Sequence, residues 1–468
     1  MGNFPYQTKE ELQLEIEKLG LDIIYSTNTS ILFDSKDFSC RGVNYSIPNR
    51  FTIHPMEGYD ATDTGDPTEL TLRRYERYGH AGAGIVWFEA VAVTNEGRSS
   101  PHQLYLNVKN IKKFSDLISH FTNSRLQLLK KNEDLPQEIF GRPLKILQLT
   151  HSGRYSKPMD IKYPLRACEN FELDQVMHIN PERGEIVSDP YLESLQDAFL
   201  EAIGLAEEVG FDGVDIKSCH GYLISELLGS YSRRNSKYGG ETLRNRQKFL
   251  LDVIKKATRE FPQLLFTVRL NLFDALPYPY GMGTKEIDSD GNPRIIDLNE
   301  LHQLLKHLQF LGIRLVSFTA GNPNYKPYLS RPFIQNAFKG KDAPEHSLYS
   351  IYRILSCLRE ISKNHPNLIS IGTAFTWFQQ FLPNFAAGEI QRNSFQCIGY
   401  GRMAFSYPDF PIDLFKKGFI NPKKVCITCS KCTELMRMGN ATGCVVRDKI
   451  YAELYRNTYA EYGKKNPI

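Results

Sequence analysis

The feature that most constrains the fold of this chain is a helix-then-strand pattern that recurs along most of its length. Eight short apolar segments have the length and composition of buried strands, and amphipathic helical patterns separate most of them. Eight strands with crossover helices are the count of a (β/α)8 TIM barrel, an α/β fold. The predicted strands span residues 50–56, 84–93, 145–151, 213–217, 264–270, 314–320, 368–374 and 395–401.

The helix predicted before the fourth strand illustrates the pattern. Asp189 is expected as its N-cap with Pro190 at the first helical position, and apolar residues then recur at three- and four-residue steps until Gly210. A later helix begins in the same way, where Asp297 and Glu300 predict a capping box before a leucine stripe.

A doubly wound open sheet is the alternative α/β architecture. Its usual glycine fingerprint is absent, because GHAGAG at 79–84 lacks the G-x-G-x-x-G spacing and precedes its strand. The barrel is therefore the better interpretation. We expect residues 1–45 to form an N-terminal helix and lead-in segment, 46–405 the barrel, and 406–468 a cysteine-rich C-terminal extension.

Composition narrows the function classes. A net charge of +4 over 468 residues gives no support for a nucleic-acid or membrane surface. The first 20 residues carry acidic side chains instead of the apolar core of a signal peptide, and no apolar run is long enough to span a bilayer. Four of the nine cysteines lie between 426 and 444, which is typical of a metal site in a reducing compartment. We expect a cytoplasmic protein.

Residues that suit a binding site collect where the predicted strands end. In a barrel of this kind the active site lies at that end of the strands. The set combines hydrogen-bonding side chains, fixed cations and glycines that permit close backbone approach, which indicates a site for a large polar ring system with a phosphate. Its members are residues 55–57, 89–90, 148–151 and 217–222, with Arg269, Gly321, Gly401 and Arg402.

At these positions the chain resembles the old yellow enzyme (NADH:flavin oxidoreductase) family of FMN-dependent barrels, in the branch related to dienoyl-CoA reductase and trimethylamine dehydrogenase. The motifs that carry the resemblance follow the family's order over about residues 45 to 445. They are NRFTIHPMEGYDAT, KILQLTHSGR, GFDGVDIKSCHGYL, SRRNSKYGGETLRNR, FTVRLN and IGYGRMAFSYP.

The resemblance implies which residues hold FMN, noncovalently because no cysteine lies near Met56. The backbone of residues 55–57 and Ala90 would lie against the ring, and Gln148 and Arg269 would bind its pyrimidine edge. An arginine suits that edge because reduced flavin is negatively charged there. A salt bridge in the barrel core is the alternative role for Arg269. The implied set is Pro55, Met56, Glu57, Ala90, Gln148 and Arg269, with Gly321, Gly401 and Arg402 on the phosphate.

The resemblance also implies the catalytic residues. Lys217 and His220 would donate to the substrate carbonyl, Tyr222 would protonate carbon, and Tyr59 would line the substrate pocket. Lys217 departs from the usual histidine, so an ion pair with Glu57 or another acid is the alternative. Glu57 departs from the usual Thr or Cys, and its charge would lower the flavin potential. Residues 155–185 are expected to form an excursion over the substrate.

The C-terminal cysteines have their own spacing. Cys426, Cys429, Cys432 and Cys444 suit an iron–sulfur cluster or a zinc site with four thiolate ligands, and free thiols are the third alternative. In the branch that the chain resembles, a similar motif holds a [4Fe–4S] cluster. Electrons would then reach FMN from NAD(P)H directly or from a partner through the cluster.

Three functions follow from these residues. The leading hypothesis is an FMN-dependent reductase of the C=C bond of a small α,β-unsaturated carbonyl compound. The second is an FMN and iron–sulfur amine-type dehydrogenase that passes electrons out through the cluster. The third is a zinc-stapled interaction protein, which the small net charge and the strand-end residues oppose. The sequence leaves homo-oligomerisation open.

Overall fold

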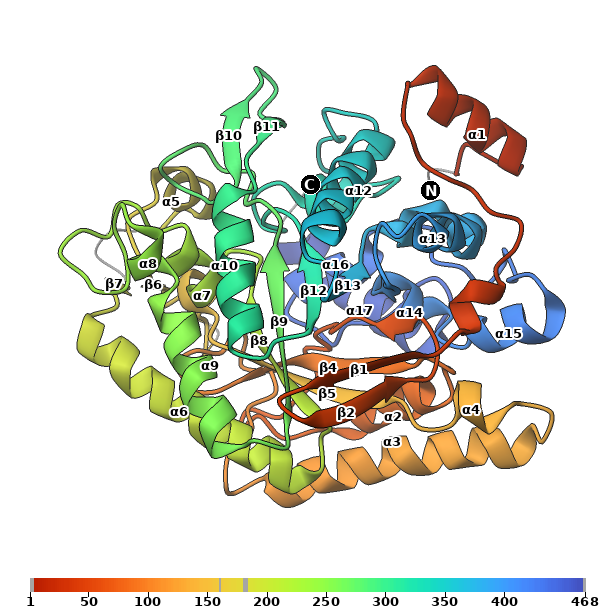
Figure 1. Cartoon of the computed structure of the whole chain (residues 1–468), viewed down its shortest axis with the longest axis horizontal. Helices are drawn as coiled ribbons and strands as arrows, with labels where there is room; N and C mark the ends of the chain where they lie inside the picture. Colours follow the sequence, from red (N-terminus) through yellow and green to blue (C-terminus); the bar gives the residue numbers. More distant parts are fainter. Residues whose placement is uncertain (1–3, 160, 180–183, 466–468) are drawn as a thin grey trace.

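The barrel is present in the computed structural model, which describes residues 4–159, 161–179 and 184–465. Eight parallel strands follow one another in chain order around the barrel, and β14 pairs with β3 to close it (Figure 1). Each of the eight predicted segments overlaps one of these strands, and five of them contain the whole strand. The eight strands are β3 (Phe51–Ile53), β4 (Ile85–Ala92), β5 (Leu144–Thr150), β8 (Gly213–Ser218), β9 (Leu265–Asn271), β12 (Leu315–Thr319), β13 (Ile369–Gly372) and β14 (Cys397–Tyr400).

The barrel strands are apolar because both of their faces are covered. Every residue of β4, β8 and β9 is buried, as expected for parallel strands with side chains inside the barrel and helices outside it. The helices that cover the barrel lie around its outer face in Figure 1. The main ones are α2 (Glu69–Gly79), α3 (Ile111–Lys131), α6 (Asp189–Val209), α9 (Lys248–Glu260), α10 (Asn299–Phe310), α12 (Ser347–Asn364) and α13 (Leu382–Gln391).

Two predicted helix starts are wrong in detail. The N-cap of α6 is Ser188, because the Asp189 carboxylate instead accepts hydrogen bonds from residues 233–237. The N-cap of α10 is Leu298, and no side chain caps this helix. Asp297 accepts a bond from the amide of Asn299, while Glu300 pairs with a buried arginine. Distant partners therefore bind the carboxylates of Asp189 and Glu300, whereas Asp297 keeps a local bond.

A hairpin that the sequence did not reveal closes the amino-terminal end of the barrel. It consists of β1 (Lys36–Cys40) and β2 (Val43–Ile47), which follow α1 (Lys9–Lys18). Cys40 and Ile47 pack against the first residues of the barrel strands, among them Ile85 and Leu265. The opposite end of the barrel, where the predicted site residues gather, is thus the open one.

Insertions surround that open end. The excursion after β5 carries β6 (Leu165–Arg166), α5 (Phe171–Met177) and β7 (Glu185–Ile186), although residues 160 and 180–183 of the expected excursion lie outside the described residues. A second hairpin, β10 (Thr284–Ile287) with β11 (Pro293–Ile296), follows β9. After β14 the chain continues through α14 (Arg402–Ser406), α15 (Phe410–Lys417), α16 (Lys431–Arg437) and α17 (Lys449–Lys465).

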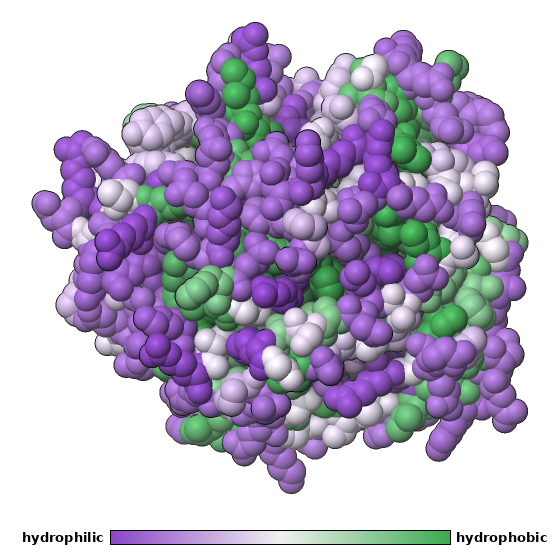
Figure 2. Space-filling view, in the orientation of Figure 1, coloured by the Kyte–Doolittle hydropathy of each residue, from purple (hydrophilic) through white to green (hydrophobic). Residues whose placement is uncertain are grey.

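The face shown in Figure 2 is mostly hydrophilic, with small apolar patches scattered over it. Within the described ranges, no helix is long and apolar enough to cross a membrane.

Candidate active site

A cavity opens at the carboxyl end of the barrel, and we call it the barrel-end cavity. It brings together six of the residues predicted to hold the flavin or act beside it: Pro55, Met56, His220, Arg269, Gly401 and Arg402. Sequence reasoning missed other lining residues, namely His54, Thr319, Pro323, Ser330, Arg331, Thr373, Ala374, Thr376 and Gly399. Ala90, Gln148, Glu57, Lys217 and Gly321 do not line it.

The cations of this cavity lack carboxylate partners. Arg269 is buried and forms no ion pair with any residue that the structure describes, so the alternative of a barrel-core salt bridge finds no support there. Burial lowers the pKa of Arg269. The Nη1 atom of Arg402 is buried without a hydrogen-bond partner, and its Nη2 donates to the carbonyl of Pro332 at 2.6 Å. Buried cations without counter-ions favour an anionic ligand.

Gly401 is required by close packing beneath the cavity. A Cβ atom at this position would lie 2.6 Å from the sulfur of Met56, which would force that side chain to move. Gly321, expected at the phosphate, has both of its backbone polar groups bonded within the chain, and its predicted contact with the phosphate stays a prediction. Its amide donates to the carbonyl of Phe273 at 2.8 Å, and its own carbonyl accepts from Asn271 at 3.1 Å. Gly321 therefore shapes the turn after β12 with a φ of +65°.

Two further residues expected at the flavin ring form hydrogen bonds with neighbouring side chains. The Gln148 amide donates to Asp215 at 2.6 Å. Burial raises the pKa of Asp215 to about 6. The carbonyl of Ala90 accepts a bond from Gln103 at 2.9 Å. Their predicted contacts with flavin stay predictions.

The expected catalytic residues lie at the end of β8 and in the loop that follows it: Lys217 belongs to the strand, and His220 and Tyr222 come after it. His220 takes a φ of +65°, and its amide donates to Asn271 at 3.2 Å. Its Nε2 atom lies 3.1 Å from the hydroxyl of Thr319. Burial, with the charges of Arg269 and Lys217 nearby, holds the pKa of His220 well below its usual value. The imidazole is therefore neutral at neutral pH and can act as a hydrogen-bond donor.

Lys217 forms the ion pair that was its alternative interpretation. Its Nζ lies 2.8 Å from Glu57 Oε1, and the two side chains are only 5% and 14% exposed. The same carboxylate oxygen accepts the Tyr222 hydroxyl at 3.2 Å, and Nζ lies 3.6 Å from the centre of the Tyr222 ring. Burial and the Glu57 charge raise the pKa of Tyr222, so the phenol stays protonated. The ammonium group keeps N–H bonds for a second acceptor.

A buried ionic network fixes the loop that carries Glu57. Arg74 pairs with both Asp60 and Glu89, all three almost fully buried. Glu89 also accepts the amide of Gly58 at 2.7 Å. A Cβ atom on Gly58 would lie 2.0 Å from the Arg74 guanidinium, so only glycine fits between the network and the loop. The carboxylate of Glu57 is thus held at the mouth of the barrel by charges beneath it.

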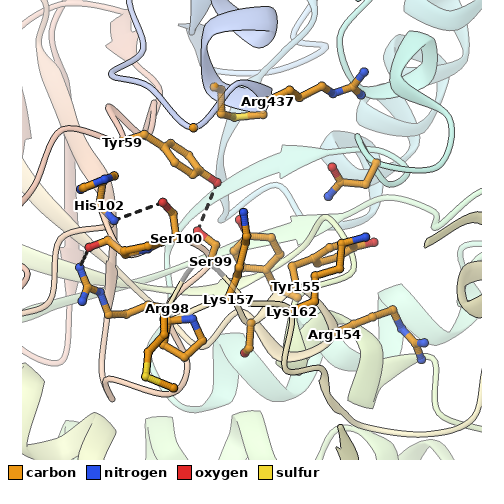
Figure 3. A pocket seen from close by; sticks show the side chains of 18 of the residues that line it. Tyr59, Arg98, Ser99, Ser100, His102, Arg154, Tyr155, Lys157, Lys162 and Arg437 are labelled. Atoms are coloured by element: carbon orange, nitrogen blue, oxygen red, sulfur yellow. Dashed lines mark hydrogen bonds between the residues drawn. The ribbon is translucent and has the colours of Figure 1, made fainter. Parts of the chain in front are cut away.

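A larger cavity of about 940 Å³ adjoins this group, and we call it the vestibule. Tyr59 and Tyr222 both line it. Figure 3 shows the Tyr59 hydroxyl directed at Ser99, at 3.2 Å, and Ser99 donates in turn to Glu57 Oε2 at 3.2 Å. Residues of the excursion (154–159, 162 and 177) and of the segment 436–439 complete the wall.

The nine cysteines are all free thiols. Cys219 is fully buried, and burial raises its pKa to about 12, as expected for a packing residue. Cys426, Cys429, Cys432 and Cys444 line one small cavity, the cysteine cavity, together with Arg402. In the part of the chain that the structure describes, no three His, Cys, Asp or Glu side chains form a group that could hold a metal ion. The predicted metal site is therefore not demonstrated, although its four residues are brought together.

With this geometry in view, comparisons with known proteins define the class. The family model for the NADH:flavin oxidoreductase / NADH oxidase family matches residues 43–279. The chain belongs to this family, which places it among the flavin oxidoreductases.

Particular relatives agree with that assignment. The chain is 28% identical over 223 residues to an NADPH dehydrogenase of Clostridium acetobutylicum, covering 47% of this chain and 58% of that one. It is 30% identical over 253 residues to an NADPH dehydrogenase of Geobacillus thermodenitrificans, covering 53% and 65%. The matches thus span less than two thirds of these relatives' lengths.

Solved structures share the fold. A 2-naphthoyl-CoA reductase in complex with 2-naphthoyl-CoA superposes with a TM-score of 0.68 and 16% identity, covering 92% of this chain and 58% of that one. A histamine dehydrogenase from Rhizobium sp. 4-9 superposes with a TM-score of 0.65 and 17% identity, covering 91% of this chain and 53% of that one. The old yellow enzyme homologue from Zymomonas mobilis superposes with a TM-score of 0.58 and 19% identity, covering 84% of this chain and 94% of that one. At these identities the likeness shows the fold alone.

Proposed function

We propose that this protein binds FMN in the barrel-end cavity and reduces the C=C bond of a small α,β-unsaturated carbonyl compound. The observation that carries the proposal is the pairing of two features at one barrel end. Arg269 and Arg402 are cations without carboxylate partners among the described residues, and a neutral histidine, a lysine and a protonated tyrosine lie beside them. Bound reduced flavin would supply hydride to the alkene.

The residues that would hold FMN follow from the cavity lining. Arg269 would face the pyrimidine edge, while Arg402 and Gly401 would face the phosphate, with Pro55 and Met56 against the ring. Arginine suits a phosphate because its fork can donate two parallel hydrogen bonds. The predicted contacts of Gln148, Ala90, Glu57 and Gly321 remain part of this proposal only as family expectations.

The chain's own residues would then handle the substrate. When hydride reaches the β-carbon, negative charge develops on the carbonyl oxygen, and donors aimed there stabilise it. The neutral imidazole of His220 and a free N–H of Lys217 are such donors. Tyr222 would give its proton to the α-carbon, and Lys217, stacked on its ring, would stabilise the resulting phenolate.

The test separates the two half-reactions by stopped flow, with an enone and a quinone as alternative acceptors. Tyr222→Phe should slow reduction of the enone and spare the quinone, which needs no proton on carbon. Reduction of the flavin by NADPH should be unchanged in the same variant. Equal slowing of both acceptors, or of neither, would show that Tyr222 is not the acid on carbon.

A second candidate is an FMN amine-type dehydrogenase. Glu57 favours it, because a carboxylate bonded to Tyr222 and Ser99 of the vestibule wall could bind a substrate ammonium group, as it binds that of Lys217. Anaerobic mixing distinguishes the two: reduction of the flavin by amines and not by NADH or NADPH would support the dehydrogenase.

We further propose that the four clustered cysteines hold a [4Fe–4S] cluster. The four cysteines line one cavity, which supports this proposal. In a [4Fe–4S] cluster each thiolate binds a different iron, so the four sulfur atoms need not be close enough to share one ion. Zinc would need thiolates about 3.8 Å apart, from its Zn–S bonds of about 2.3 Å. Iron and sulfide analysis of anaerobically purified protein decides between them.

Electrons would come from NAD(P)H or from a protein partner, and the free thiols fit a reducing, cytoplasmic setting.

A further inference from the structure

Two arginines form the wall between the barrel-end cavity and the cysteine cavity. Arg402 lines both cavities. Arg331, in the loop after β12, lines the barrel-end cavity and donates from Nη1 to the Thr433 hydroxyl at 3.1 Å. Thr433 directly follows Cys432 on α16. Arg331 therefore lies between the barrel-end cavity and the cysteine-rich segment.

This wall has an excess of positive charge. Neither arginine forms an ion pair within the described ranges, and the Nη1 atom of Arg402 has no hydrogen-bond partner. Burial and the charges of Arg402 and Arg437 lower the pKa of Arg331 to about 9. Two neighbouring cations destabilise each other unless an anion lies close to both. A phosphate in the barrel-end cavity is such an anion.

The loop that carries Arg331 is anchored on the cysteine-rich segment at further points. The amide of Ile334 donates to both the carbonyl and the hydroxyl of Thr428, at 3.3 and 3.2 Å. The amide of Phe338 donates to the Glu434 carboxylate at 2.6 Å. Thr428 and Thr433 flank Cys429 and Cys432 in the sequence. The position of Arg331 therefore depends on the fold of the segment that carries the four thiols.

We propose that Arg331 is a second phosphate-binding residue of the flavin site and that the cysteine-rich segment holds it in place, so that the two sites are thermodynamically coupled. This inference rests on the proposed binding of FMN. Loss of the cysteine site weakens FMN binding because it releases Arg331, and by reciprocity bound FMN stabilises the cysteine site. The effect is specific to the phosphate, since Arg331 faces that end of the cavity together with Arg402.

The experiment compares FMN with riboflavin, which lacks the phosphate, on the full-length chain purified anaerobically. Arg331→Met and Thr433→Val should each weaken FMN binding about tenfold, within the usual range of such couplings, and leave riboflavin binding unchanged. Thr433→Ser, which keeps the hydroxyl, should restore the FMN affinity. Lys423→Met is the matched control, because it removes an exposed charge of the same C-terminal extension that lines neither cavity, and both flavins should bind it as they bind the wild type.

The outcomes separate this inference from the proposed function. A wild-type chain that binds neither flavin overturns the proposed function and this inference with it. If the wild-type chain binds FMN, and Arg331→Met and Thr433→Val prefer FMN over riboflavin as strongly as the wild type does, only the inference is overturned. Riboflavin binding also reports folding, and equal losses of both flavins in the variants would show a structural role for Arg331 and contradict a phosphate contact.

Discussion

The buried ion pair between Glu57 and Lys217 makes the sharpest prediction. Removing one partner of such a pair leaves an unpaired buried charge, at a cost of about 3–5 kcal/mol. Glu57→Gln keeps an oxygen that can accept the hydrogen bond from Tyr222. We therefore expect the free energy of unfolding to fall by about 3 kcal/mol, near the lower end of this range. Lys217→Met should cost a similar amount, because Glu57 stays charged and retains its bonds from Tyr222 and Ser99.

The double variant distinguishes the pair from two independent residues. Glu57→Gln with Lys217→Met leaves no unpaired charge, and its loss should be smaller than the sum of the single losses by at least about 2 kcal/mol. The assay is urea unfolding with FMN in excess, comparing midpoints at an unchanged m-value. An exposed pair is the control: Lys237 and Glu193 are 47% and 50% exposed, and Lys237→Met should leave the urea midpoint nearly unchanged. Additive losses at Glu57 and Lys217 would refute this reasoning.

Arg269→Ala should weaken FMN binding and make the flavin harder to reduce; full occupancy with an unchanged potential would count against its placement at the pyrimidine edge. His220→Ala should slow enone reduction about 10²–10³-fold, the usual loss for one oxyanion donor, as measured by stopped flow. The His220 pKa lies well below 6.5, so titration of His220 should cause no change in rate between pH 6 and 8. Near pH 6 only the unfolded chain binds this proton, so His220 makes the protein less stable as the pH falls below 6.5. If His220→Asn leaves the dependence of stability on pH unaltered, this reasoning is wrong. Cys432→Ser should remove iron and sulfide while riboflavin still binds, and wild-type protein without iron would end the cluster proposal. Gly401→Ala should weaken flavin binding by displacing Met56, and Met56→Ala in the same chain should restore it.

The sequence predicted the barrel because its strands are buried on both faces and are therefore apolar without interruption, as in β4 and β8. It also placed Met56, Arg269 and Arg402 correctly at one end, because parallel strands bring their carboxyl ends together. The hairpin β1–β2 escaped notice because only one face of each strand is partly covered.

Contacts between distant segments could not be read from local patterns. Glu57 and Lys217 are 160 positions apart, and only the barrel register brings their side chains together. Arg331 directly follows the short helix α11 (Pro327–Ser330) and belongs to no motif, so nothing in its neighbours pointed to the barrel-end cavity. Gln148 donates a hydrogen bond to Asp215, an acid whose burial the sequence did not reveal.

The walls of the vestibule come from the loop at 95–102, the excursion after β5 and the segment at 436–439, and none of these segments contributes a barrel strand. Mutations there can change the shape and charge of the entrance while the eight strands, Arg269 and the loop after β8 keep their geometry. During evolution, proteins related to this one can therefore change their substrates while the residues around the electron-transfer site stay the same. For the same reason, libraries that randomise Met436 and Met438 are the economical starting point for engineering what this protein accepts.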